Sequence, residues 1–158
     1  MISITRLFDF PYYQQENYNT EVALATKQNG AWVKTSSQEY IAKANAISRA
    51  LLRMGVQKDD KIALITSNNR TEWNIMDIGI LQTGAQNVPI YPTISEEDYE
   101  YILNHSESIY CFVSDDEVYQ KVKDSCPDDK ICIDKHIPVT GVSLNKTSGE
   151  LYVNLQPN

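Results

Sequence analysis

The sequence predicts an α/β fold, built on a mostly parallel sheet with helices on both faces. The first observation is that short apolar runs alternate with helical stretches from Lys61 onward, in the order β-α-β-α-β-α-β. Short connections between such units favour parallel strands, because each helix carries the chain back along the sheet. The second observation is that several of these runs are almost uninterrupted by polar residues, which is typical of strands buried on both faces. Residues 66–113 hold the clearest of these units.

Composition excludes several classes of protein. A chain of 158 residues suits one domain with a sizeable core, and its 42% hydrophobic and 22% charged residues are ordinary for a globular protein. The net charge of −7 argues against a nucleic-acid partner, which would need a basic face. Arg6, Asp9 and Pro11 interrupt the apolar start, so we expect no signal peptide. No apolar run reaches the ~18 residues of a membrane span, and we expect a cytoplasmic protein with reduced thiols.

The first elements precede the alternating units. Residues 1–20 are aromatic and polar without a period, and we interpret them as an extended N-terminal arm, or alternatively as a frayed terminus. Two β-type runs, Glu21–Thr26 and Ala31–Lys34, are separated by Asn29-Gly30. Because Asn-Gly suits the tight turn between antiparallel strands, this stretch predicts a hairpin.

A capped helix follows the hairpin. Ser36 and Glu39 stand at the spacing of a capping box, in which each side chain satisfies the backbone N–H of the other. Gly55 predicts the helix end, since glycine readily takes the left-handed conformation found there. The predicted apolar stripe comprises Tyr40, Ile41, Ala44, Ile47, Leu51 and Leu52.

The remaining predicted elements complete the alternation and add a terminal hairpin. Helix 71–83 is apolar around much of its circumference, which favours burial between layers. Ser95 is expected to cap the next helix, and Asp115 or Ser114 the one after it. The later helices are expected to start near Ser95 and Asp115. The terminal hairpin is expected to consist of Val139–Leu144 and Glu150–Leu155. The expected strands of the sheet are 61–66, 86–91, 109–113 and 130–134. The predicted domain division is 1–20, the arm; 21–136, the α/β subdomain; and 137–158, the hairpin.

Motifs for catalysis are missing from the sequence. With six glycines, the chain contains neither G-x-x-x-x-G-K-[ST] nor G-x-G-x-x-G, and it has no G-x-S-x-G nucleophile elbow. We therefore assign no catalytic, cofactor-binding or metal-binding residue. The best candidate for a ligand-adjacent loop is formed by Pro89, Tyr91, Pro92 and Thr93, because two prolines restrict its shape and two hydroxyls follow a strand. The alternative is a rigid structural corner.

Other residues with reactive side chains have structural interpretations. Cys126, Cys132 and His136 could be imagined as metal ligands, but their spacing fits no standard zinc pattern and a fourth ligand is missing. Cys111 lies inside an apolar strand and is expected to be a small core residue. His105 stands near a helix C-terminus, where an imidazole is favourable for electrostatic reasons.

Several separated blocks together resemble the AMP-forming acyl-CoA synthetases, and in particular the long-chain fatty acid–CoA ligases. Their order along the chain matches that family, and the resemblance extends over about Thr5 to Val122. The blocks are Trp32–Tyr40, Leu52–Val56, Lys58–Leu64, Asn68–Trp73, Asp77–Ala85, Val88–Thr93 and Tyr101–Ser106.

This resemblance implies the N-terminal subdomain of the adenylate-forming fold and a function. Such ligases use ATP and magnesium to convert a fatty acid to an acyl-adenylate, and then transfer the acyl group to coenzyme A. The family's phosphate loop and C-terminal lysine lie beyond residue 158. We therefore expect a truncated fragment, catalytically inactive alone, whose partner is the rest of a ligase or a second copy bound through exposed apolar surface.

Two alternatives remain from the sequence. The chain could be a non-catalytic α/β binding or assembly module. In addition, Pro138–Ser148 resembles the first strands of a bacterial Ig-like repeat, which would indicate a truncation, a frame change or a fusion.

Overall fold

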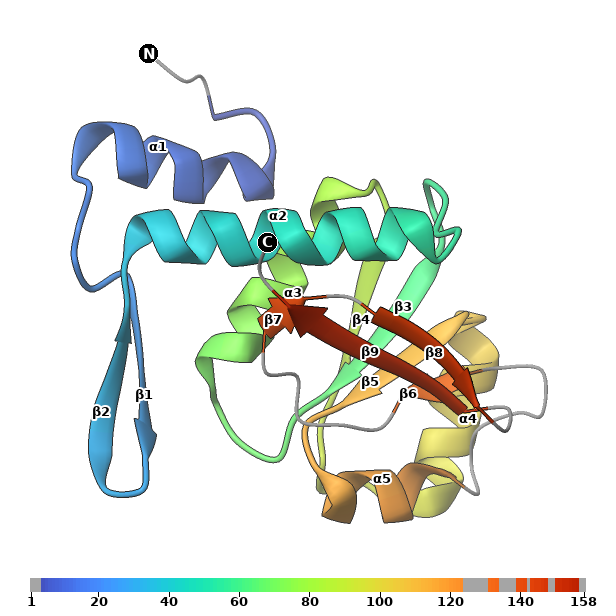
Figure 1. Cartoon of the computed structure of the whole chain (residues 1–158). Helices are drawn as coiled ribbons and strands as arrows, with labels where there is room; N and C mark the ends of the chain where they lie inside the picture. Colours follow the sequence, from blue (N-terminus) through green and yellow to red (C-terminus); the bar gives the residue numbers. More distant parts are fainter. Residues whose placement is uncertain (1–3, 124–130, 134–138, 142, 148–149, 157–158) are drawn as a thin grey trace. The chain divides into compact units, whose positions relative to one another are not determined.

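A computed structural model describes residues 4–123 with their side chains, and the backbone of residues 131–133, 139–141, 143–147 and 150–156 (Figure 1). The elements are η1 (Leu7–Asp9), α1 (Phe10–Asn17), β1 (Leu24–Gln28), β2 (Ala31–Thr35), α2 (Ser37–Arg53), β3 (Lys61–Ile65), α3 (Thr71–Gln82), β4 (Gln86–Ile90), α4 (Glu96–Ser106), β5 (Tyr110–Val113), α5 (Asp116–Val122), β6 (Ile131–Ile133), β7 (Val139–Gly141), β8 (Ser143–Thr147) and β9 (Glu150–Gln156). This order confirms the predicted α/β fold and its alternation from Lys61 onward.

The chain divides into two compact units that interleave in sequence. The first comprises Met1–Val56 and Asn69–Thr83, and the second Gln57–Asn68 and Gly84–Asn158. The division into an arm, a subdomain and a terminal hairpin stays a prediction.

The first unit corrects the prediction of an extended arm over residues 1–20. This segment contains η1 and α1 instead. The expectation was wrong because α1 shows an unusual pattern of burial: its buried residue is Pro11, whereas Phe10 at its start is exposed. The polar Asp9, which directly precedes α1, is only 6% exposed. A helix with this orientation lacks the apolar stripe by which buried helices are recognised.

The hairpin β1–β2 forms as predicted, although β1 starts three residues later than the apolar pattern indicated. The strands are antiparallel, with Leu24 opposite Thr35 and Gln28 opposite Ala31. Asn29 and Gly30 both have positive φ, at 49° and 82°, as the tight turn requires.

Helix α2 confirms the predicted cap and end. Ser36 Oγ accepts a hydrogen bond from Glu39 N at 3.1 Å, and Ser36 N donates to Glu39 Oε2 at 2.8 Å. The hydrogen bonds that the Ser36 backbone N and the Ser36 hydroxyl donate to the Glu39 carboxylate hold the pKa of Glu39 below its usual value. Gly55 has a φ of +91° just beyond the helix. One predicted core residue is wrong: Leu52 is 54% exposed, because it lies about 100° around the helix from buried Leu51.

Helices α2 and α3 approach each other closely within the first unit. A Cβ placed on Gly79 would lie 2.5 Å from Ile47 Cγ2 and 3.1 Å from the Ala44 carbonyl oxygen. Helix α3 is buried on several sides, as its apolar composition predicted, and its fully or nearly buried members are Thr71, Ile75, Met76, Ile78, Gly79 and Ile80.

The second unit holds a parallel sheet of strand order β4-β3-β5-β6. Strand β3 is central and buried on both faces, which explains its almost uninterrupted apolar sequence. Helices α4 and α5 pack on one face, where Tyr99 and Val118 belong to one core cluster. The other buried members of this cluster are Ala63, Ile65, Ile90, Leu103, Cys111, Val113 and Val122. Burial raises the pKa of the Cys111 thiol to about 12, consistent with its predicted role as a core residue.

The terminal hairpin is present, with an added strand. Strands β8 and β9 pair antiparallel, with Ser143 opposite Asn154 and Thr147 opposite Glu150. The predicted first arm is divided into β7 and β8, and β7 pairs with β9 in parallel.

Candidate functional site

The predicted loop after β4 projects from an edge strand of the parallel sheet. Pro89 lies opposite Leu64 of β3, and its missing N–H suits a strand with a neighbour on one side. Tyr91 is 80% exposed, and Pro92 is half-buried beside it. Thr93 is exposed. The structure therefore places both hydroxyls of the predicted loop where a ligand could reach them.

A buried tyrosine anchors this loop. Tyr99 of α4 is fully buried, and its Oη donates a hydrogen bond to the Tyr91 carbonyl oxygen at 3.2 Å. Burial raises the pKa of Tyr99, so the phenol keeps the proton that it donates. At the start of α4, Ser95 Oγ accepts from Asp98 N at 3.2 Å, which confirms the predicted cap. The side chain of Tyr91 is thus exposed, while its backbone carbonyl is fixed by the hydrogen bond from Tyr99.

A second polar group lies at the carboxyl ends of β3 and β5. Ser67 N donates to Ser114 Oγ at 2.9 Å, and Ser114 Oγ donates to Asp115 Oδ2 at 2.7 Å. Asp115 Oδ1 accepts from Val118 N at 3.0 Å, so Asp115 caps α5 as one of the two predicted candidates. Sequence reasoning missed Ser67; its one signal was its position just after a buried strand.

The strand order indicates that the carboxyl ends of β3 and β5 are a place where a ligand can bind. The chain passes from β3 to its neighbour β4 and then crosses to the opposite side of β3 to form β5. The connections therefore change direction between β3 and β5, and open α/β sheets bind ligands beyond the carboxyl ends of the strands at such a point. The available groups, two hydroxyls and one carboxylate already used as a cap, can orient a ligand through hydrogen bonds. They do not form a nucleophile–base pair.

The other reactive side chains take structural positions. His105 stacks on Tyr101 one helical turn away, with ring centroids 5.4 Å apart and planes 6° apart. The imagined metal ligands Cys126 and His136 lie outside the described residues, and of Cys132 only the backbone in β6 is described. Within the part of the chain that the structure describes, no group of three His, Cys, Asp or Glu side chains is arranged to hold a metal ion.

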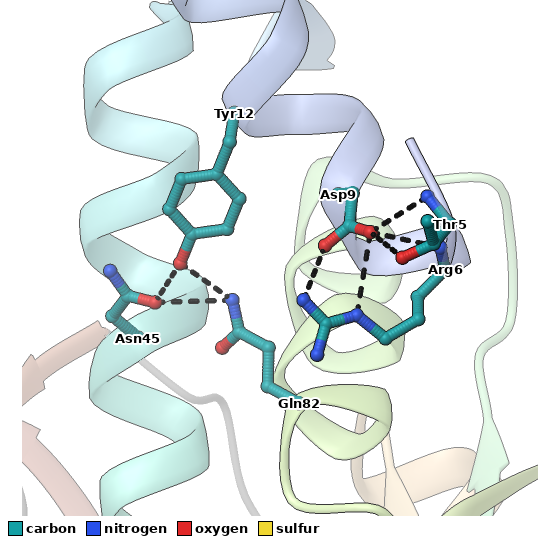
Figure 2. Close-up of polar contacts among 6 residues, drawn as sticks. All are labelled: Thr5, Arg6, Asp9, Tyr12, Asn45 and Gln82. Atoms are coloured by element: carbon teal, nitrogen blue, oxygen red, sulfur yellow. Dashed lines mark hydrogen bonds and ion pairs between the residues drawn. The ribbon is translucent and has the colours of Figure 1, made fainter. Parts of the chain in front are cut away.

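Polar contacts hold the N-terminal segment within the first unit (Figure 2). Tyr12 Oη donates to Asn45 Oδ1, and Gln82 Nε2 donates to both of these oxygens at 3.0 and 3.1 Å. Three segments far apart in the sequence meet here, which is why no local pattern predicted the contact.

Nearby, the Asp9 carboxylate forms hydrogen bonds with residues three and four positions before it in the N-terminal segment (Figure 2). It accepts hydrogen bonds from Arg6 Nη2 at 2.9 Å and from the Thr5 backbone N at 3.0 Å. The bonds from the Arg6 guanidinium and from the Thr5 backbone hold the pKa of Asp9 well below its usual value.

Comparisons with solved structures identify the fold as that of adenylate-forming enzymes. The N-terminal subdomain of NpsA from Klebsiella oxytoca superposes with a TM-score of 0.66 at 18% sequence identity, over 80% of this chain and 30% of that chain. At this identity the likeness shows the fold alone. It agrees with the subdomain that the resemblance implied.

The family follows from sequence. Residues 13–155 match the family of AMP-binding enzymes, and the chain belongs to that family. The match includes the segment 138–148 that resembles an Ig-like repeat.

Within this family, the chain is similar to proteins named as long-chain-fatty-acid–CoA ligases. The chain is 36% identical over 88 residues to long-chain-fatty-acid–CoA ligase FadD15 of Mycobacterium bovis, covering 56% of this chain and 14% of the relative. It is 27% identical over 137 residues to long-chain-fatty-acid–CoA ligase ACSBG2 of Rattus norvegicus, covering 87% of this chain and 20% of the relative. The chain thus spans between about a seventh and a fifth of these proteins.

Proposed function

We propose that this chain is the N-terminal part of a long-chain fatty acid–CoA ligase. The observation that carries the proposal is the family match over residues 13–155, combined with the 36% identity to the mycobacterial ligase. In the proposed reaction a fatty acid carboxylate attacks the α-phosphorus of ATP, giving acyl-AMP and pyrophosphate. The thiol of coenzyme A then displaces AMP to give acyl-CoA. We place this activity in the cytoplasm.

The part played by these residues is positioning. The parallel sheet carries Ser67, Ser114 and the loop with Tyr91 and Thr93 at strand carboxyl ends, where α/β folds present ligands. ATP, magnesium and coenzyme A would be held mainly by the remainder of the ligase, because these 158 residues contain no complete phosphate loop of the family. Stabilising the charge that develops on the transferred phosphoryl group needs such a cradle, so we propose that the isolated chain is inactive.

Two experiments test these statements separately. First, this chain replaces the matching N-terminal segment of the mycobacterial ligase, and acyl-CoA formation from a long-chain fatty acid is measured. A folded chimera that forms acyl-CoA supports the proposal, and a folded chimera without activity contradicts it. Second, pyrophosphate release is measured for the purified chain with ATP, magnesium and fatty acid. No release above buffer is expected, and measurable release contradicts the proposed inactivity.

The exposed apolar residues favour a second candidate, a non-catalytic assembly module. Among the residues whose side chains the structure describes, eight of the ten large exposed hydrophobic ones belong to the first unit. They are Ile4, Leu7, Phe10, Tyr18, Val22, Trp32, Val33 and Leu52. A contiguous patch of such side chains marks an interaction surface, and this candidate requires that they form one. Sedimentation velocity over a range of concentrations decides: a defined dimer supports this candidate, and a concentration-independent monomer contradicts it.

A further inference from the structure

Most side chains of the hairpin β1–β2 are exposed. It is a separate two-stranded sheet, and neither strand pairs with another described strand. In Figure 1 it projects away from the N-terminal end of α2, within the first unit. A two-stranded ribbon of this kind offers one face to solvent if its other face is anchored.

One face is anchored to the first unit. Thr26 Oγ1 accepts a hydrogen bond from Thr71 N at 2.8 Å and lies 2.7 Å from Thr71 Oγ1. Thr35 is on the same face, since side chains alternate along a strand, and it is buried. The face that carries Thr26 and Thr35 is therefore anchored at these two residues, whereas Gln28, Ala31 and Val33 on the same face are exposed.

The opposite face combines one tryptophan with two lysines. Trp32 lies directly opposite Lys27, and Lys34 lies opposite Ala25, so all four side chains share this outward face. All four are exposed, and Trp32 is 65% exposed. Residues 24–35 include no aspartate or glutamate, although the whole chain has a net charge of −7. This basic aromatic face is a local exception to the charge of the molecule.

We propose that the basic aromatic face of the hairpin, formed by Ala25, Lys27, Trp32 and Lys34, binds the surface of an anionic lipid bilayer. Tryptophan has an apolar body and one N–H donor, and it is enriched at the level of lipid headgroups. The two lysines can lay their aliphatic stems on apolar surface while their ammonium groups meet lipid phosphates. Their positive charge is complementary to an anionic leaflet.

Size favours a bilayer over a protein partner. A stable protein–protein interface takes roughly 20–30 residues from each side. The outward face supplies four side chains on strands of five residues each. Peripheral lipid contact needs no such area, because two lysines and one inserted aromatic side chain each add to a weak, reversible attraction to an anionic surface. Among the described helices none is long and apolar enough to cross a membrane, so the proposed contact is peripheral. The proposal stands on the hairpin alone and does not need ligase activity.

Vesicle binding of the 158-residue chain tests the proposal. Co-sedimentation is compared between pure phosphatidylcholine vesicles and vesicles that also contain phosphatidylserine. The chain has two tryptophans, so a Trp73→Phe background makes Trp32 emission a direct probe of insertion. We expect binding to the anionic vesicles with a blue shift of Trp32 emission, and a loss of binding as salt screens the lysines.

Hairpin variants are paired with controls elsewhere on the surface. Lys27→Gln and Lys34→Gln should each weaken binding about fivefold, and Trp32→Ala at least about tenfold. Lys58→Gln and Tyr101→Ala are the matched controls, because Lys58 is an exposed lysine and Tyr101 is also 65% exposed. Circular dichroism checks that each variant is folded.

Three outcomes would overturn the proposal. The first is equal binding to neutral and anionic vesicles. The second is equal loss in hairpin and control variants, which would mean that the contact is not specific to the hairpin. The third is a Trp32 blue shift that grows with protein concentration without vesicles, because the face would then bind a second copy or another protein surface.

Discussion

Gly79→Ala tests the close approach of α2 and α3. The added Cβ would lie 2.5 Å from Ile47 Cγ2 and 2.6 Å from Ile47 Cβ, about 1 Å inside the usual carbon–carbon contact. Rotating the Ile47 side chain moves Cγ2 but not Cβ, so backbone must also shift. Over-packing of this kind costs about 1–3 kcal/mol. Alanine is better than glycine in a helix interior by about 1 kcal/mol. We expect a net loss of up to about 2 kcal/mol in the free energy of unfolding.

Urea unfolding, followed by circular dichroism and by the fluorescence of Trp73 on α3, measures this change. An unchanged slope against urea shows that only stability has altered. Ile47→Ala provides the background for a double-mutant cycle, because it removes the contact with Cγ2 and leaves only the contact with Cβ. In that background Gly79→Ala should be less destabilising by about 1 kcal/mol.

The control for intrinsic propensity is Ala42→Gly on the exposed side of α2, which should lose about 1 kcal/mol. If Gly79→Ala instead stabilises the protein by about the same amount, the two helices do not touch at Gly79 and the reasoning fails.

Three further changes test the polar contacts. Asp9→Asn should lower Tm at neutral pH. The folded-state pKa of Asp9 is depressed, so the ionised carboxylate stabilises the protein above the usual aspartate pKa of about 3.9. The Tm difference between the two proteins should therefore shrink as the pH falls below that value. A pH-independent difference would contradict this assignment. Tyr12→Phe should cost about 1 kcal/mol in urea unfolding, and a neutral result would mean that its hydroxyl contacts contribute nothing. Tyr99→Phe should cost about as much and raise hydrogen exchange around Tyr91, and unchanged exchange would remove Tyr99 as the anchor of that loop.

Local patterns predicted much of the fold because their causes are local. The caps at Ser36 and Ser95 and the helix end at Gly55 depend on residues within one turn, and all three are confirmed. The same reasoning failed for α1, because its buried residue is Pro11 while Phe10 is exposed, so no apolar stripe marks the helix. Leu52 shows a smaller error of the same kind, since one step around a helix separates a buried from an exposed position.

Part of the candidate site could be predicted from the sequence. The loop with Tyr91 and Thr93 was found because two prolines mark it, and its role as a ligand contact stays a proposal. Ser67 was missed because its partner Ser114 is 47 residues away, and only the pairing of β3 with β5 brings the two together.

The sequence by itself determined the α/β class, the family and the position of nearly every helix and strand after residue 20. These depend on hydrophobic period, caps and turn residues, which act over a few positions. Tertiary structure decided that α1 is a helix, which strands are neighbours, and which face of the hairpin points outward. Those features depend on contacts between distant segments, and in a hairpin a shift of one residue in register would move Trp32 to the opposite face.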